Sequence, residues 1–224
     1  MYHSKYFLTY TLIGINVVLY LISALYSGTL DDLPLDKLLD LGAMNGLLVV
    51  FQGEWYRIVT AMFLHGGLMH IAMNMFSLYI VGRGVELYFN KSSYLILYMM
   101  SGLFGAMVSL YMHPNSVGVG ASGAIFGLFG AIVGFFFYHK DRLGSQSKEV
   151  LKEFIVILVL NLVLGLSISS IDLSAHIGGL LVGILGGYII SRYPKANWIF
   201  LGFMIVVLMI SKGMIESSYA QIYL

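Results

Sequence analysis

The chain has 224 residues, of which 59% are hydrophobic and only 10% are charged, whereas soluble domains average about 45–50% apolar and about 25% charged residues. This composition predicts a membrane protein. The formal net charge of +1 argues against a nucleic-acid partner, which would need a basic patch, and the absence of cysteine excludes disulfides, thiolate metal sites and a cysteine nucleophile.

Seven segments are apolar over roughly the 20 residues that a helix needs to cross the hydrocarbon core. The sequence therefore predicts an all-α, polytopic helical bundle, in which residues 1–224 form a single integral membrane domain. The first segment has neither a cleavage site of small residues nor an Arg/Ser-rich presequence, so we expect it to be retained as a span. The predicted spans cover about 6–27, 59–82, 93–112, 118–138, 152–169, 174–191 and 197–214.

The connection 28–58 is the one long polar stretch between spans. Its first part is acidic, and the moderately apolar piece that follows, 41–51, is too short to cross a membrane. We expect this piece to form a short amphipathic element at the membrane interface.

Lysine and arginine are distributed unevenly between the two sets of connections. If the N-terminus is cytoplasmic, nine of the 12 basic residues lie inside, and only Lys37, Arg57 and Lys212 lie outside. The positive-inside rule therefore predicts a cytoplasmic N-terminus and an outer 28–58 connection. With seven spans, the C-terminus is then outside.

The second span carries three polar side chains. His70 and Asn74 are four residues apart, so both project from one face of a helix. His65 lies near the outer end of the same span. Because polar groups in a membrane usually face the bundle interior, we expect these three residues to point inward near the outer leaflet.

Small residues recur every three or four positions in the fourth and sixth spans. Such stripes allow helices to approach closely, since no side chain holds the backbones apart. The sequence therefore predicts that these two spans pack together. The stripes consist of Gly123, Gly127, Gly130 and Gly134 in the fourth span, and of Ala175, Gly179, Gly183 and Gly187 in the sixth.

Ser122 and His176 stand at the outer ends of these two spans, at matching depth. The glycines before Ser122 favour a helix that begins near this serine, where its hydroxyl and amide would face the positive helix end. A nucleophile, a general base and oxyanion donors require this kind of convergence. Taken alone, however, Ser122 could serve packing by bonding its own backbone, and His176 could be an interhelical hydrogen-bond donor.

Metal binding and transport are the alternative functions. His65, His70 and His176 could supply three imidazoles, but the sequence has no His-Glu-x-x-His helix and no acidic residue in the interior of a span. Transport normally needs carboxylates near the membrane midplane, whereas Glu86 and Asp172 lie at span ends. We therefore expect neither a metal nor a cofactor.

Four motifs in this order resemble those of the rhomboid family of intramembrane serine proteases. The resemblance covers about residues 6–191 and implies a six-helix core, to which 197–214 adds one C-terminal span. The motifs are Glu54-Trp55-Tyr56-Arg57, His65-x4-His70-x3-Asn74, Gly120-Ala121-Ser122-Gly123 and Ala175-His176-x2-Gly179-x3-Gly183.

The resemblance implies that Ser122 is the nucleophile and His176 its general base, in a dyad without an aspartate. It also implies an oxyanion hole made of His70, Asn74 and the Ser122 amide. Phe126 takes the place of a tyrosine often found there, so that stacking on the histidine is retained and a phenol hydrogen bond is lost. The further supporting residues are His65, Gly120, Gly123, Gly179, Gly183 and Arg57, the last as a hydrogen-bonding residue of the first loop.

By this resemblance, we expect a serine endopeptidase that hydrolyses a peptide bond in or near the outer part of the transmembrane segments of single-span proteins. Helical carbonyls are already hydrogen-bonded, so a substrate must unwind locally, which favours segments with helix-weakening residues. The alternative is a catalytically inactive rhomboid-like protein that binds transmembrane clients. Expected partners are transmembrane substrates and the lipid bilayer, and the missing presequence favours a prokaryotic plasma (inner) membrane.

Overall fold

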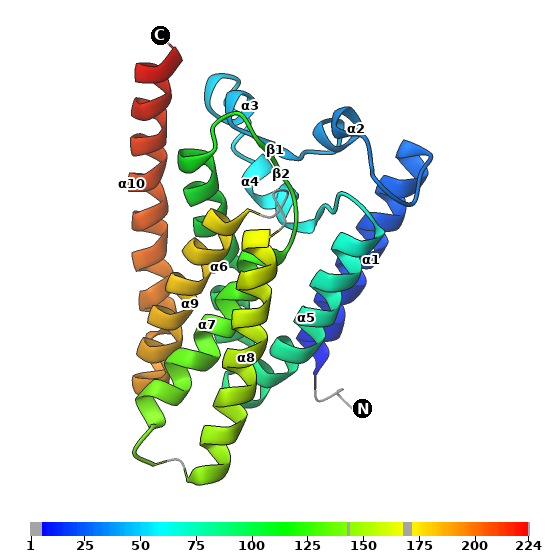
Figure 1. The fold of residues 1–224 in the computed structure, drawn as a ribbon. Helices are drawn as coiled ribbons and strands as arrows, with labels where there is room; N and C mark the ends of the chain where they lie inside the picture. The colour runs from blue at the N-terminus through cyan, green and yellow to red at the C-terminus, as the bar shows by residue number, and fades with distance from the viewer. Residues whose placement is uncertain (1–5, 143, 168–171, 224) are drawn as a thin grey trace.

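The computed structural model describes residues 6–142, 144–167 and 172–223, and it consists almost entirely of helices (Figure 1). The predicted all-α, polytopic bundle is confirmed. Its long helices are α1 (Phe7–Ser27), α5 (Leu68–Tyr88), α6 (Lys91–Met112), α7 (Ser122–His139), α8 (Ser145–Ser167), α9 (Leu173–Arg192) and α10 (Asn197–Tyr223).

Among the described residues, α1, α6, α7, α9 and the stretch Pro194–Tyr223 are each long and apolar enough to cross a membrane. A sixth span results if Arg57–Phe63 and Leu68–Tyr88 are counted together. Helix α8 is not in this set, and its first half carries two Lys-Glu pairs at 148–149 and 152–153. The predicted span 152–169 also runs into residues outside the described part, so the total of seven spans stays a prediction.

The second predicted span, 59–82, is wrong as a single helix. The chain forms α4 (Arg57–Thr60) and a 3-10 turn, η1 (Ala61–Phe63), and then bends by 89° before α5 begins at Leu68. The bend contains the pair Gly66-Gly67, and each glycine in a helix costs about 1 kcal/mol relative to alanine. His65 therefore lies in the bend rather than on a helix.

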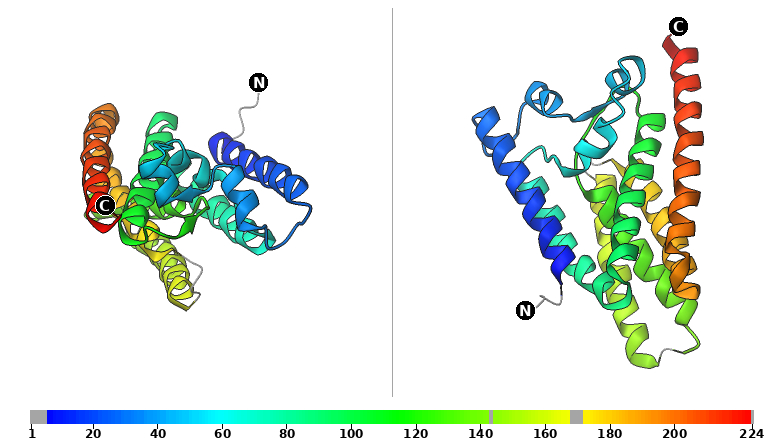
Figure 2. Two further views of the ribbon diagram at one scale, coloured as in Figure 1. Left: turned by 90° about the horizontal axis from the view of Figure 1, so that it is seen from above. Right: turned by 180° about the vertical axis from the view of Figure 1, so that it is seen from behind.

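A layer of short elements covers one end of the bundle (Figures 1 and 2). It contains α2 (Leu35–Asp40), β1 (Met44–Asn45), α3 (Gly46–Phe51) and α4. The expected single element over 41–51 is thus a turn, a strand and a helix, because Asn45 accepts hydrogen bonds from the Leu47 and Leu48 amides and starts α3 there. We call this end of the molecule the capped end.

The opposite end, at which α1 begins, gathers basic residues from three connections (Figure 1). We call it the basic end and define it by Arg83, Lys91, Lys140, Arg192 and Lys195. Helix α10 starts at this end and finishes at the capped end. The alternation of helix directions matches the sequence-based topology.

Helices α7 and α9 make the most extensive contact of any described pair, which confirms the predicted packing of the two glycine stripes. A methyl group at Gly179 would overlap the Gly123 carbonyl, and one at Gly183 would overlap the Gly127 carbonyl. The two backbones are therefore in direct contact at these positions, and any side chain there would force them apart.

The last helix continues to Tyr223, beyond the predicted end at residue 214. An ion pair between Lys212 and Glu216 at 3.3 Å, one helical turn apart, supports this extension. The Tyr219 hydroxyl donates to the Leu110 carbonyl at 2.9 Å. The end of α10 is thus attached to the end of α6.

Candidate active site

Ser122 is the first residue of α7, so the expected helix start near this serine is confirmed. The preceding Gly120 has φ of +125°, a conformation that side chains other than hydrogen rarely adopt. Its amide donates to the Ala61 carbonyl at 2.9 Å. Strand β2 (Val117–Gly118) pairs antiparallel with β1, and Met44 lies opposite Gly118. The loop that leads to Ser122 is therefore attached to the capped-end layer.

His70 and Ser122 border the same small space. A methyl group at Gly120 would lie 2.8 Å from His70 Nε2 and 3.8 Å from Ser122 Oγ. The Gly66 amide donates to His70 Nδ1 at 3.4 Å. Because Nδ1 accepts this bond, the proton of the neutral ring lies on Nε2, and a donor faces the space beside Ser122.

Asn74 and His65 complete the polar set that the sequence predicts on this side. One amide hydrogen of Asn74 Nδ2 is donated to the His70 carbonyl at 3.0 Å, one helical turn away. The second amide hydrogen is not used by this bond. His65 is fully buried and packs edge to face against His70, with 5.1 Å between the ring centroids.

His176 lies on α9 and is 5% exposed. Phe126, one turn after Ser122, stacks on its imidazole with 4.2 Å between the centroids and 9° between the planes. The stacking expected for Phe126 is therefore present. His176 Nδ1 is buried without a hydrogen-bond partner among the described residues. The aromatic stack thus orients this ring, and no described carboxylate forms a hydrogen bond with its Nδ1.

Close backbone contact places the serine and the histidine at the same level. A methyl group at Gly123, next to Ser122, would be 3.4 Å from the carbonyl of Ala175, next to His176. The structure therefore brings Ser122, His176, Phe126 and His70 into one region at the capped end of α7 and α9.

Asp172 caps the helix that carries His176, and sequence analysis did not assign it a role. Its carboxylate accepts hydrogen bonds from the Ser174 hydroxyl and, at 3.1 Å, from the Ala175 amide. Burial raises the pKa of Asp172, but the hydroxyls of Ser109 and Ser174 and the Ala175 amide lower it more, so the pKa is below its ordinary value. An aspartate just before an apolar helical run is a recognised capping signal.

We expect Asp172→Ala to lower the free energy of unfolding by about 1 kcal/mol at neutral pH, and Asp172→Asn by less, since asparagine also caps helices. Because the folded-state pKa is depressed, the stabilisation is full above the ordinary carboxyl pKa and is lost as the pH falls through the lower folded value. Thermal unfolding in detergent micelles over an acid pH series measures both effects. An alanine variant as stable as wild type at neutral pH would contradict the capping role.

Arg57 holds the capped-end layer together from its interior. It is 7% exposed, and its Nη1 donates to the carbonyls of Leu39 at 2.7 Å and Ala43 at 2.9 Å. Its Nε forms an ion pair with Glu54, which sequence analysis quoted in a motif without assigning a role. The spacing of three residues between opposite charges is the signal that could have identified this pair.

Comparison with known proteins adds independent evidence. The family model of the rhomboid domain matches residues 52–193. The chain is 37% identical to RHOMBOID-like protein 6, mitochondrial, of Arabidopsis thaliana over 70% of this chain and 51% of the relative. It is 32% identical to rhomboid protease GluP of Bacillus subtilis over 84% of this chain and 36% of the relative. It is also 32% identical to the putative rhomboid protease YdcA of Bacillus subtilis, over 64% of this chain and 69% of that protein.

The chain thus spans about half or less of the length of the first two of these relatives. The matched residues 52–193 run from just before α4 through α9 and include every motif identified in the sequence. Helix α10 lies outside the matched residues.

Proposed function

The chain belongs to the rhomboid family, and we propose that it is an intramembrane serine endopeptidase in which Ser122 is the nucleophile and His176 the general base. The observation that carries this proposal is the α7–α9 contact, where Phe126 stacks on His176 one turn after Ser122. The presence of both residues favours an active protease over the alternative, an inactive rhomboid-like protein that binds transmembrane clients.

In the proposed reaction, Ser122 Oγ attacks the carbonyl carbon of the substrate peptide bond while His176 takes the hydroxyl proton. The C–O bond forms as the carbonyl π bond breaks, which places a negative charge on the carbonyl oxygen. When this tetrahedral intermediate collapses, the C–N bond breaks and His176 gives its proton to the leaving amine. Water then hydrolyses the acyl-enzyme by the same two steps.

The charged oxygen needs donors that are already in place, because preorganised donors in a low-dielectric site stabilise it most. His70 Nε2 faces the space beside Ser122, and Asn74 has a second amide hydrogen one turn away. The Ser122 amide belongs to the first turn of α7, where amides have no intrahelical partner. We assign these three groups to the oxyanion hole.

Hydrolysis also requires water and an unwound substrate. Ser122 is only half-buried and lies next to the capped-end layer, so we propose that water enters from that end. The substrates are proposed to be single-span membrane proteins whose segment near the capped end contains Gly, Pro or other helix-weakening residues. The positive-inside rule favours a cytoplasmic location for the basic end, so we propose that the site lies toward the extracytoplasmic face of the membrane.

Labelling with a fluorescent fluorophosphonate tests the nucleophile directly. We expect wild-type protein in micelles to form a covalent adduct on Ser122, and Ser122→Ala to take up no label. Ser211→Ala, in α10, is the matched control and should label like wild type. Labelling of the Ser122→Ala variant would refute the assignment, and a folded wild-type protein that takes no label would favour the inactive alternative.

A further inference from the structure

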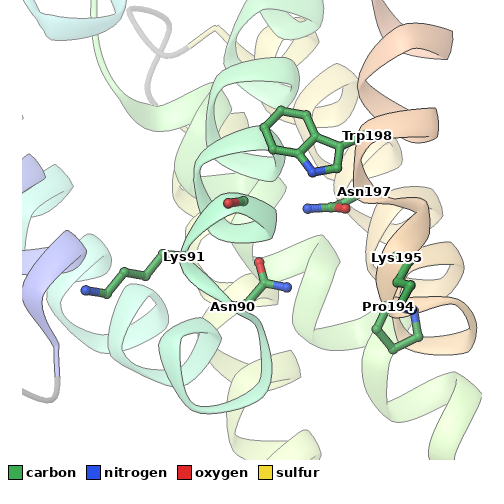
Figure 3. A pocket seen from close by; sticks show the side chains of 7 residues that line it. Asn90, Lys91, Pro194, Lys195, Asn197 and Trp198 are labelled. Atoms are coloured by element: carbon green, nitrogen blue, oxygen red, sulfur yellow. The ribbon is translucent and has the colours of Figure 1, made fainter.

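A pocket opens at the basic end, at the far end of the bundle from Ser122. It lies between the α5–α6 corner and the α9–α10 corner, which includes η2 (Pro194–Ala196) (Figure 3). It is an open depression with a volume of about 600 Å³ rather than an enclosed cavity. The lining residues are Asn90, Lys91, Ser92, Pro194, Lys195, Asn197 and Trp198.

The charge of this pocket favours an anion. Its lining contains two lysines and no carboxylate. Lys195 belongs to η2, while the Lys91 side chain extends away from the other labelled residues toward α1, with its ammonium 5.2 Å from the Phe7 ring centroid (Figure 3). Both lysines therefore add positive potential at the rim of the pocket, and Lys195 is the one that is not directed toward α1.

Two asparagines supply polar contacts inside the pocket. Asn197 is only 4% exposed and lines the pocket, and no described residue forms a hydrogen bond with its side chain, whose amide atoms keep slight access to the pocket. Because no protein group bonds this amide, its hydrogens are available to a ligand in the pocket that accepts hydrogen bonds. Asn90 uses its Oδ1 to accept a hydrogen bond from the Ser93 amide at 2.9 Å, which leaves its amide hydrogens as donors.

Helices α6 and α10 also both begin at this pocket, and the N-terminal end of a helix favours negative charge.

The surroundings of the pocket favour a lipid as the source of the anion. Trp198 forms part of the wall and is 63% exposed, as expected for tryptophan at a membrane interface. Ile199 and Phe203 follow along α10, four residues apart and exposed, and offer an apolar path for an acyl chain. We propose that this pocket binds the phosphate headgroup of an anionic phospholipid from the leaflet at the basic end.

Native mass spectrometry of the full chain in micelles, titrated with phosphatidylglycerol or phosphatidylcholine, tests this site. We expect phosphatidylglycerol to bind more tightly, and Lys195→Gln to weaken it roughly fivefold, the effect of one lysine near an anionic lipid. Asn197→Asp, which keeps the side-chain shape and adds a negative charge, should remove the preference for phosphatidylglycerol. Lys140→Gln is the matched control, because it removes one charge from the same end outside the pocket.

Three outcomes would overturn the proposal. These are equal affinity for the two lipids, an equal effect of Lys195→Gln and Lys140→Gln, and displacement of the lipid by inorganic phosphate at the same concentration. The last result would assign the pocket to free phosphate. Thermal unfolding in neutral detergent verifies that the Asn197→Asp variant is folded. Lys195→Gln tests lipid binding at an exposed position, where the substitution does not disturb the packing.

Discussion

Ser122→Ala is expected to abolish cleavage of a single-span model substrate in liposomes, with a loss of at least about 10⁴-fold in rate, because the nucleophile is removed. His176→Ala should cause a comparable loss. The double variant should be no worse than either single variant, since residues that act as a unit in one reaction do not contribute additively. Separation of substrate and product on a gel over a time course measures the rate.

His176→Phe is the matched control for this experiment. It keeps an aromatic ring that can stack on Phe126, although a slightly larger one, and removes the titratable nitrogens, so we expect a folded and inactive protein. His70→Phe, by contrast, should retain residual turnover, because one oxyanion donor contributes about 10²–10³-fold. Turnover near the wild-type rate in Ser122→Ala or in His176→Phe would disprove the proposed mechanism.

Gly183→Val is expected to lower the free energy of unfolding by about 3 kcal/mol or more, at the upper end of the cost of overpacking. A side chain at this position overlaps the backbone carbonyl of Gly127, which cannot move aside as a flexible side chain could. The helices must then separate, which displaces His176 from Ser122. A misplacement of about 1 Å can cost about 10²-fold in rate, so activity should fall as well.

Gly202→Val provides the comparison, because no atom outside its own stretch of helix lies within 4 Å of the position that its first side-chain carbon would take. It makes the same chemical change in α10 and should leave melting temperature and cleavage close to wild type. If Gly183→Val melted and cleaved like Gly202→Val, the direct contact between α7 and α9 would be wrong.

Part of the site could be predicted from the sequence because its signals are local. The glycines before Ser122 weaken the preceding backbone, so the start of α7 could be predicted within a few residues. The stripes around Gly123 and Gly179 have helical spacing, and close packing of α7 and α9 follows from it. Asp172 also carries a local capping signal that sequence analysis passed over.

Other features depend on residues that are distant in the sequence. The bend before Leu68 interrupts a run that is apolar enough to be a span. It could not be predicted from hydropathy, because hydropathy is averaged over a window and one glycine pair hardly changes the average. The contact of Gly120 with both His70 and Ser122 depends on the pairing of β1 with β2 and on the bond to Ala61. The residues adjacent to each of these groups in the sequence do not indicate which distant group it contacts.

The membrane environment, the all-helical class, the order of the motifs and the pairing of the two glycine stripes could all be predicted from the amino-acid sequence. These properties follow from composition and from the spacing of residues along the chain, both of which can be read from residues that are close together in the sequence. The three-dimensional arrangement was needed to see that His70 Nε2 faces the space beside Ser122 and that segments 90–92 and 194–198 form a pocket at the basic end. Such convergence depends on how helices cross and how loops attach, and these relations bring together side chains that the chain itself keeps far apart.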